Sequence, residues 1–138
     1  MKRKNLYFTG LLLVMLMIVT SCEKIGNKAT LIAQWEVVKM EVFVYSGEEL
    51  ISQDTYEPEF FMLEFKEDGT LTVYFDPEDL SQYEETIWTH TTDPVKEGDH
   101  INIEGDDVFI DSLTERTLVF SFWESASDKL VFTLRKVE

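Results

Sequence analysis

Two neighbouring segments in the middle of the chain alternate apolar and polar side chains, and this alternation limits the fold more than any other feature. Large apolar residues recur at every second position in residues 61–65 and again in residues 71–75. Because successive side chains of a β-strand point to opposite faces, each segment is expected to form a strand with one apolar face. Between them, Asp68 and Gly69 suit the positive φ angles of a tight turn. The pattern predicts an antiparallel hairpin.

Similar strand-like segments, separated by polar turns, follow one another along the chain after residue 30. Besides the central hairpin, the expected strands are residues 34–45, 85–91, 100–104, 108–113, 118–122 and 130–134. Residues 47–58 are expected to form an acidic loop, since Pro58 disfavours a strand interior. Short connections without crossover helices predict an all-β antiparallel meander. We expect a small eight-stranded up-and-down barrel, and a two-layer β-sandwich, which has the same alternation, is the alternative.

The first 21 residues have the organisation of a secretory signal peptide. Three basic residues, Lys2, Arg3 and Lys4, precede an uninterrupted uncharged stretch that is apolar over residues 6–19. A basic start, a short apolar segment and small residues before a cleavage point are typical of export signals. The apolar run is shorter than the roughly 20 residues of a transmembrane helix. The sequence therefore predicts a signal peptide over residues 1–21.

The end of this segment resembles the lipobox of bacterial lipoproteins. Val19 lies three positions before Cys22, and the small residue Ser21 directly precedes the cysteine. The resemblance implies that Cys22 carries a lipid anchor after cleavage and that residues 22–29 form the lipidated N-terminus and tether, which precede the expected barrel domain of residues 30–138. It also implies attachment to a membrane of the cell envelope, for which we expect the outer membrane of a Gram-negative bacterium, with the face left open. The alternative is a secreted protein in which Cys22, the only cysteine, is a free thiol.

The charge balance and the arrangement of polar residues exclude several classes of function. The chain has 27 acidic and 12 basic residues, and three of the basic ones lie in the predicted signal peptide. Such an excess of negative charge disfavours nucleic acid as a partner. His90 and His100 lack the spacing of a zinc site, and no serine lies in a Gly-x-Ser-x-Gly motif. We expect no metal, no cofactor and no catalytic site.

The two ends of the domain resemble the lipocalin (calycin) signature. Ala33-Gln34-Trp35 lies on the first expected strand, and Leu134-Arg135-Lys136 lies on the last. In lipocalins a Gly-x-Trp motif meets an arginine of the last strand at the closed end of the barrel. By this resemblance Trp35 and Arg135 are the structural signature, with the Arg135 guanidinium over the indole. The order of the segments over residues 30–138 is similar to that of lipocalin-like bacterial lipoproteins, most of which have no assigned function.

Two functions follow from this expected barrel, and the sequence leaves both open. If the barrel is hollow, apolar side chains on its inner face would line a site for a small hydrophobic ligand. The candidate lining residues are Phe61, Phe65, Phe75, Phe120, Phe122 and Phe132. If the same side chains fill the interior, the protein is instead a surface or periplasmic module that interacts with a protein or glycan. Its contacts would be exposed aromatic residues, with Tyr56, Tyr83, Trp88 and Trp123 as candidates.

Overall fold

A computed structural model describes residues 30–138, which form an all-β fold without a helix. The predicted signal peptide, Cys22 and the tether lie outside the described residues. The nine strands are β1 (Gln34–Ser46), β2 (Glu49–Tyr56), β3 (Met62–Phe65), β4 (Thr70–Tyr74), β5 (Tyr83–His90), β6 (His100–Ile103), β7 (Asp106–Leu113), β8 (Thr117–Trp123) and β9 (Asp128–Lys136). Within residues 30–138 there is no helix long and apolar enough to cross a membrane.

Eight of the strands close into an antiparallel up-and-down barrel, which confirms the predicted fold class over the sandwich. Neighbouring strands pair in the order β3-β4-β5-β6-β7-β8-β9, and β1 joins the two ends of this series. The first residues of β1 pair with β3, so that Trp35 lies opposite Leu63. On its other side β1 pairs with β9 from Trp35 to Val44. Each of the eight ring strands therefore has a paired neighbour on both of its sides.

The ninth strand, β2, lies in the segment that was expected to be an acidic loop, and that prediction is wrong. Residues 49–56 pair with the second half of β1, beyond the point where the β1–β3 pairing stops at Glu36. Gly47, with a φ of 63°, makes the turn between the two strands. Every residue of β2 is exposed. Without a buried face, β2 needs no period-two apolar pattern, which is why the sequence did not reveal it.

One end of the barrel is plugged by large apolar side chains. Trp35 is completely buried, and its indole N–H donates a hydrogen bond to the carbonyl oxygen of Leu31 at 3.1 Å. Leu31 and Val95, from the segments before β1 and between β5 and β6, are also buried there. Phe65 packs edge-to-face against Trp88, with the ring centroids 5.3 Å apart. This end is therefore a packed core.

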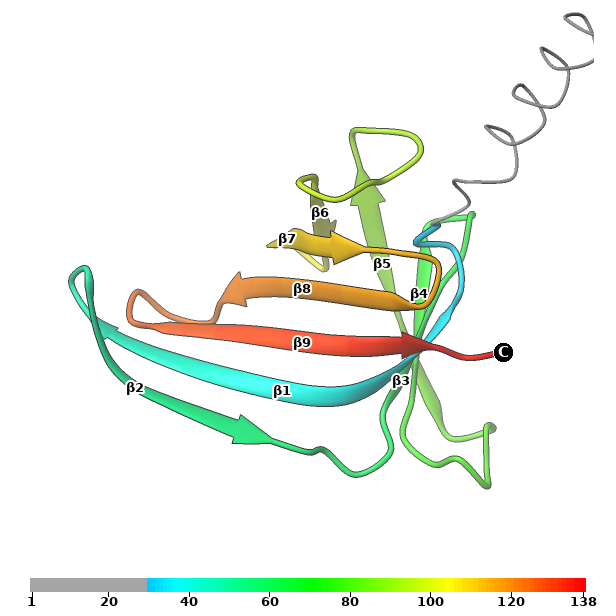
Figure 1. Cartoon of the computed structure of the whole chain (residues 1–138). Coiled ribbons are helices and arrows are strands. Elements are labelled where there is room, and N and C mark those ends of the chain that lie inside the picture. Colours follow the sequence, from blue (N-terminus) through cyan, green and yellow to red (C-terminus); the bar gives the residue numbers. More distant parts are fainter. Residues whose placement is uncertain (1–29) are drawn as a thin grey trace, which may run out of the picture.

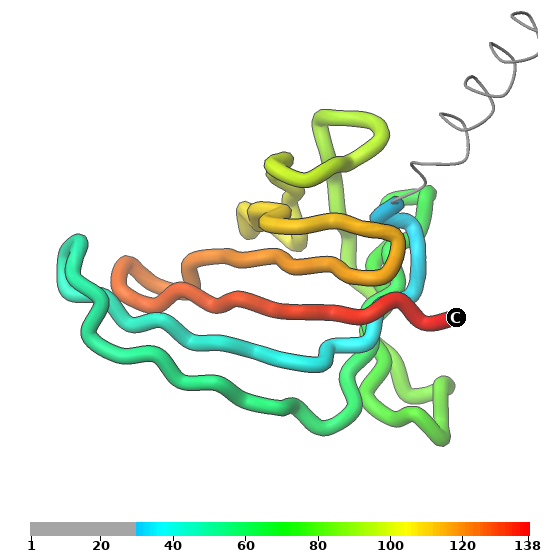
Figure 2. Tube along the Cα trace, viewed as in Figure 1, coloured from blue at the N-terminus to red at the C-terminus, as the bar shows by residue number. Residues whose placement is uncertain are grey.

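Towards the other end, the β1–β2 and β8–β9 hairpins extend beyond the ring. In Figures 1 and 2, β2, β1, β9 and β8 run side by side as an extended sheet that reaches away from β3, β4 and β5. The pairing of β1 with β2 and with β9 continues nearly to the tips of the hairpins. The barrel thus has one plugged end and one end that flares into this sheet.

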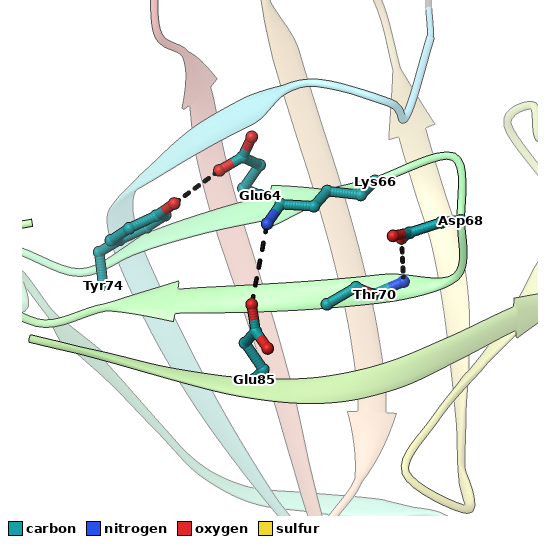
Figure 3. Close-up of polar contacts among 6 residues, drawn as sticks. All are labelled: Glu64, Lys66, Asp68, Thr70, Tyr74 and Glu85. Carbon is teal, nitrogen blue, oxygen red and sulfur yellow. Dashed lines mark hydrogen bonds and ion pairs between the residues drawn. The ribbon is translucent and has the colours of Figure 1, made fainter. Parts of the chain in front are cut away.

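The central hairpin, β3–β4, has the predicted turn and carries a polar network on its outer face (Figure 3). The Asp68 carboxylate accepts a hydrogen bond from the Thr70 backbone N–H at 2.9 Å, which lowers the pKa of Asp68. The Tyr74 hydroxyl donates to the Glu64 carboxylate at 2.7 Å. This bond, together with burial and nearby negative charge, raises the pKa of Tyr74 to about 12. These contacts lie outside the barrel, on the face opposite the core.

Candidate ligand-binding site at the open end of the barrel

The strand register places most of the predicted lining residues at the flared end. There β3 begins just after Phe61 and β4 ends just before Phe75, because Met62 and Tyr74 are the last paired residues of this hairpin. The turn between β6 and β7 and the tip of the β8–β9 hairpin lie at the same end. Inner-face side chains near these strand ends lie at the opening, whereas those near the opposite ends belong to the packed plug.

Three phenylalanines form a stacked row on the inner face of β8 and β9. Phe120 and Phe132 are directly paired in the register, and their ring centroids are 5.3 Å apart. The Phe122 ring lies nearly parallel to the ring of Phe132, at 5.9 Å. Phe120 is buried against the core, while Phe122 and Phe132 are only partly buried. The row therefore leads from the core towards solvent.

A small apolar pocket opens beside this row. Its volume is about 90 Å³, and it is lined by Ile103, Asp106, Val108, Phe120 and Phe122. A typical site for a drug-sized molecule has a volume of about 300–1,000 Å³. The pocket can therefore accept one end of an apolar molecule, with the remainder lying along the inner face of the flared sheet. Asp106 puts one carboxylate at its rim.

The remaining candidate phenylalanines lie apart from this row. Phe61 and Phe75 pack against each other at 5.9 Å, and Phe75 is 47% exposed. They lie at the ends of β3 and β4, on the flared end but on other strands of the ring. Phe65 is only 1% exposed and belongs to the plug beside Trp88. It is a core residue in this structure, whereas Phe120, Phe122 and Phe132 are brought together.

Sequence reasoning missed Ile103 and Val108 as pocket residues. Ile101 and Ile103 alternate with polar residues in β6, and in β7 Val108 and Ile110 are buried on either side of the less buried Phe109. This alternation marks the inner face of both strands. It does not show that β6 and β7 lie next to the phenylalanine row of β8 and β9. That proximity depends on the antiparallel pairing of β7 with β8, in which Ile110 lies opposite Phe120.

The two signature residues occupy different faces of the sheet. Trp35 pairs with Lys136 and Glu36 pairs with Arg135, so the side chains of Trp35 and Arg135 point in opposite directions. The Arg135 guanidinium forms an ion pair with Glu36 at 2.7 Å, and its side chain is 68% exposed. It lines a polar surface hollow of about 510 Å³ with Arg116. Arg135 therefore does not cover the indole as the resemblance implied; Leu31 caps Trp35 instead.

The aromatic residues expected as interaction contacts also separate into two groups. Tyr56, Tyr83 and Trp123 are 49%, 51% and 55% exposed. Trp88 is only 3% exposed, and its indole N–H donates to the Lys66 carbonyl oxygen at 3.1 Å. As a buried core residue, Trp88 is not available for a surface contact. The ring centroids of Trp123 and Tyr45 are 5.4 Å apart, and the Lys129 Nζ lies 5.9 Å from the Trp123 ring centroid.

No protein-family model, curated protein or solved protein structure matches this chain. The fold is a closed eight-stranded antiparallel barrel, an architecture compatible with lipocalin-like ligand-binding proteins. Within residues 30–138, no group of three or more His, Cys, Asp or Glu side chains is arranged to hold a metal ion. The small pocket at the open end has a mainly apolar lining, which suits a small apolar ligand.

Proposed function

We propose that this protein is a lipid-anchored, lipocalin-like binding protein of the cell envelope that takes a small hydrophobic ligand at the open end of its barrel. The observation that carries the proposal is the row of Phe120, Phe132 and Phe122, which runs from the buried core into a pocket open to solvent. Covering partly exposed apolar side chains with a ligand lowers the free energy, by about 25 cal/mol per Å² of apolar surface removed from water.

The size of the pocket narrows the class of ligand. A volume of about 90 Å³ holds a short alkyl end or a single ring rather than a whole lipid. Beyond the pocket, the inner face of the flared sheet continues with Leu130 and Val42, which are paired with each other and partly buried. An elongated apolar molecule that inserts one end and lies along this face fits better than a compact, fully enclosed one.

The ligand proposal is tested on the chain from residue 23 onward, which contains all nine strands and the buried core. Native mass spectrometry after gentle purification, followed by organic extraction, looks for a bound small molecule. Titration with a fluorescent fatty-acid probe measures binding directly. We expect a stoichiometric adduct or a saturable probe signal. A bare protein that also gives no probe signal would rule out the ligand site.

A matched pair of variants locates the binding. Phe122→Ser removes an inner-face ring beside the pocket, and we expect probe affinity to fall by about tenfold or more. Phe109→Ser removes a ring that is also partly buried, but Phe109 pairs with Ser121 on the outer face. We expect that variant to bind the probe normally. Equal losses in both variants would show that the probe does not enter the pocket.

The anchoring part of the proposal rests on the lipobox residues and is tested separately. Growing cells with radiolabelled palmitate should label the full-length chain, and Cys22→Ala should abolish both the label and recovery in the membrane fraction. Two or more acyl chains are needed for firm attachment, because a single chain binds membranes only marginally. An unlabelled wild-type chain in the soluble fraction would contradict anchoring without affecting the ligand site.

The packed interior favours a second candidate, an interaction module without a ligand. Fully buried side chains, including Trp35, Phe65 and Ile110, fill the plugged part of the barrel. On the outer face of the flared sheet, Trp123 is 55% exposed beside Tyr45 and Lys129. Aromatic residues with a nearby cation are frequent anchors of protein interfaces. Loss of a crosslinked envelope partner in Trp123→Ala, with probe binding intact, would favour this candidate.

A further inference from the structure

The strand β2 is the terminal strand of the sheet and has a free edge. Within residues 30–138, β2 pairs only with β1, so its other edge has no strand beside it. All eight residues of β2 are exposed. Figures 1 and 2 show β2 at the margin of the flared sheet, away from the ring. An exposed edge presents backbone N–H and C=O groups that can pair with an additional strand.

The register identifies which residues of β2 present these groups. The Tyr45 N–H donates to the Ser127 carbonyl oxygen at 2.8 Å, so it points to the β9 side of β1. Because backbone groups alternate between the two edges of a strand, those of Val42 and Val44 point towards β2. Their partners are Asp54 and Ser52. The intervening residues, Gln53 and Thr55, therefore direct their backbone N–H and C=O groups to the free edge.

This edge lacks two devices that commonly prevent strands from associating. Natural edge strands are often protected by lysine or proline, or by being very short. β2 has eight residues and contains neither lysine nor proline, and its one irregularity lies near the hairpin tip, where the register shifts between Val44 and Tyr45. The five residues from Ser52 to Tyr56 pair regularly with β1. This part of β2 can template a further strand.

The charge around the edge determines which strand it can accept. Residues 46–59 contain five acidic side chains, namely Glu48, Glu49, Asp54, Glu57 and Glu59, and no lysine or arginine. Pairing β2 with β2 of a second copy would bring these acidic side chains close together, and like charges opposite each other destabilise a sheet. A basic segment would instead be attracted, both in the encounter and in cross-strand pairs.

We propose that the β2 edge is a docking site for an extended, positively charged segment of a partner polypeptide, which adds to the barrel as an extra antiparallel or parallel strand. Main-chain hydrogen bonds to Gln53 and Thr55 hold the segment, and basic side chains pair with the acidic residues that flank them. The site is separate from the apolar pocket, whose lining comes from β6, β7 and β8. It therefore does not depend on the ligand proposal.

The test uses the chain from residue 23 onward and two synthetic peptides of opposite charge, acetyl-Lys-Val-Lys-Val-Lys-Val-Lys-amide and acetyl-Glu-Val-Glu-Val-Glu-Val-Glu-amide. We expect the lysine peptide to bind in isothermal titration calorimetry, with an affinity that falls as salt is added. In hydrogen exchange followed by NMR, the Gln53 and Thr55 amides should exchange rapidly in the free protein and slow down with the peptide. No binding of the lysine peptide, or equal binding of the glutamate peptide, would overturn the proposal.

Two variants at position 55 distinguish the contribution of the backbone N–H to peptide binding from that of the side chain. Thr55→Pro removes the outward N–H, and proline is tolerated on an edge strand where the N–H faces solvent. Thr55→Val keeps this N–H with a side chain of similar size. We expect the lysine peptide to bind about tenfold more weakly to Thr55→Pro than to Thr55→Val, the effect of roughly one lost hydrogen bond. Equal affinities would overturn strand addition.

The occupant is tested by sedimentation of the chain alone. We expect a monomer at every concentration used, because the acidic edge repels another copy. A dimer that dissociates in Thr55→Pro and persists in Thr55→Val would assign the edge to a second copy of this chain and overturn the proposed basic partner. The free energy of unfolding, measured by urea denaturation, serves as the folding control for both variants, because Thr55 is exposed and outside the core cluster.

Discussion

Replacing Trp35 by phenylalanine should lower the free energy of unfolding by about 3 kcal/mol, because this residue lies in the plugged end of the barrel. Trp35 is completely buried, and its indole N–H donates to the Leu31 carbonyl oxygen at 3.1 Å. Phenylalanine cannot donate this bond, and leaving a buried carbonyl unpaired costs about 2 kcal/mol. The smaller ring leaves a cavity of roughly 40 Å³, which at about 24 cal/mol per Å³ adds about 1 kcal/mol.

The assay is urea denaturation of the chain from residue 23 onward, followed by circular dichroism, with Trp123→Phe as the control. Trp123 is 55% exposed, and we expect its replacement to change the free energy of unfolding by no more than about 0.5 kcal/mol. A domain of this size with ordinary stability should remain folded with Trp35→Phe. If the two variants differ by less than about 1 kcal/mol, Leu31 and Trp35 do not plug the barrel as described.

Three further perturbations test the outer face, the last strand and the central turn. Because its hydrogen bond to Glu64 raises the pKa of Tyr74 to about 12, Tyr74 stabilises the fold fully below about pH 10, and this contribution is lost between about pH 10 and 12. Tyr74→Phe should cost about 1 kcal/mol near pH 7 and flatten the alkaline fall in urea stability. Arg135→Ala should lower the free energy of unfolding in urea by less than about 1 kcal/mol, because its ion pair with Glu36 is largely exposed. Leu134→Ala, at a fully buried position, should lower it by about 2–5 kcal/mol in the same assay. Gly69→Ala, at a φ of 89°, should cost about 1–2 kcal/mol by thermal denaturation, and an unchanged melting temperature would contradict the turn geometry.

Much of the strand plan could be predicted, because most strands have one buried face. The alternation around Asp68 and Gly69 indicated the β3–β4 hairpin, and similar patterns indicated the other six ring strands. β2 was missed, since all of its residues are exposed and it needs no apolar period. It forms because the second half of β1 extends past the end of β3 and would otherwise have an unpaired edge on that side.

The candidate site could be predicted only as a set of inward-facing rings. A period of two gives the face on which Phe65, Phe75 and Phe120 lie, but not their height along the barrel. The position of each ring along the barrel axis decides its environment. Phe65 lies in the plug, Phe120 borders the pocket, and Phe75 is 47% exposed beyond the end of β4. Trp88 was expected at the surface for the same reason, although the register places it beside Phe65.

By itself, then, the sequence determined the all-β class, six of the seven connections between ring strands and the apolar face of most ring strands, because these depend on local residue order. Only the tertiary structure decided that β1 closes the ring by pairing with both β3 and β9. It also decided that Arg135 faces Glu36 rather than the Trp35 indole, and that β2 is left with a free edge. These features depend on pairing between segments far apart in the chain, and the register of such pairs is set by the packing of the whole barrel.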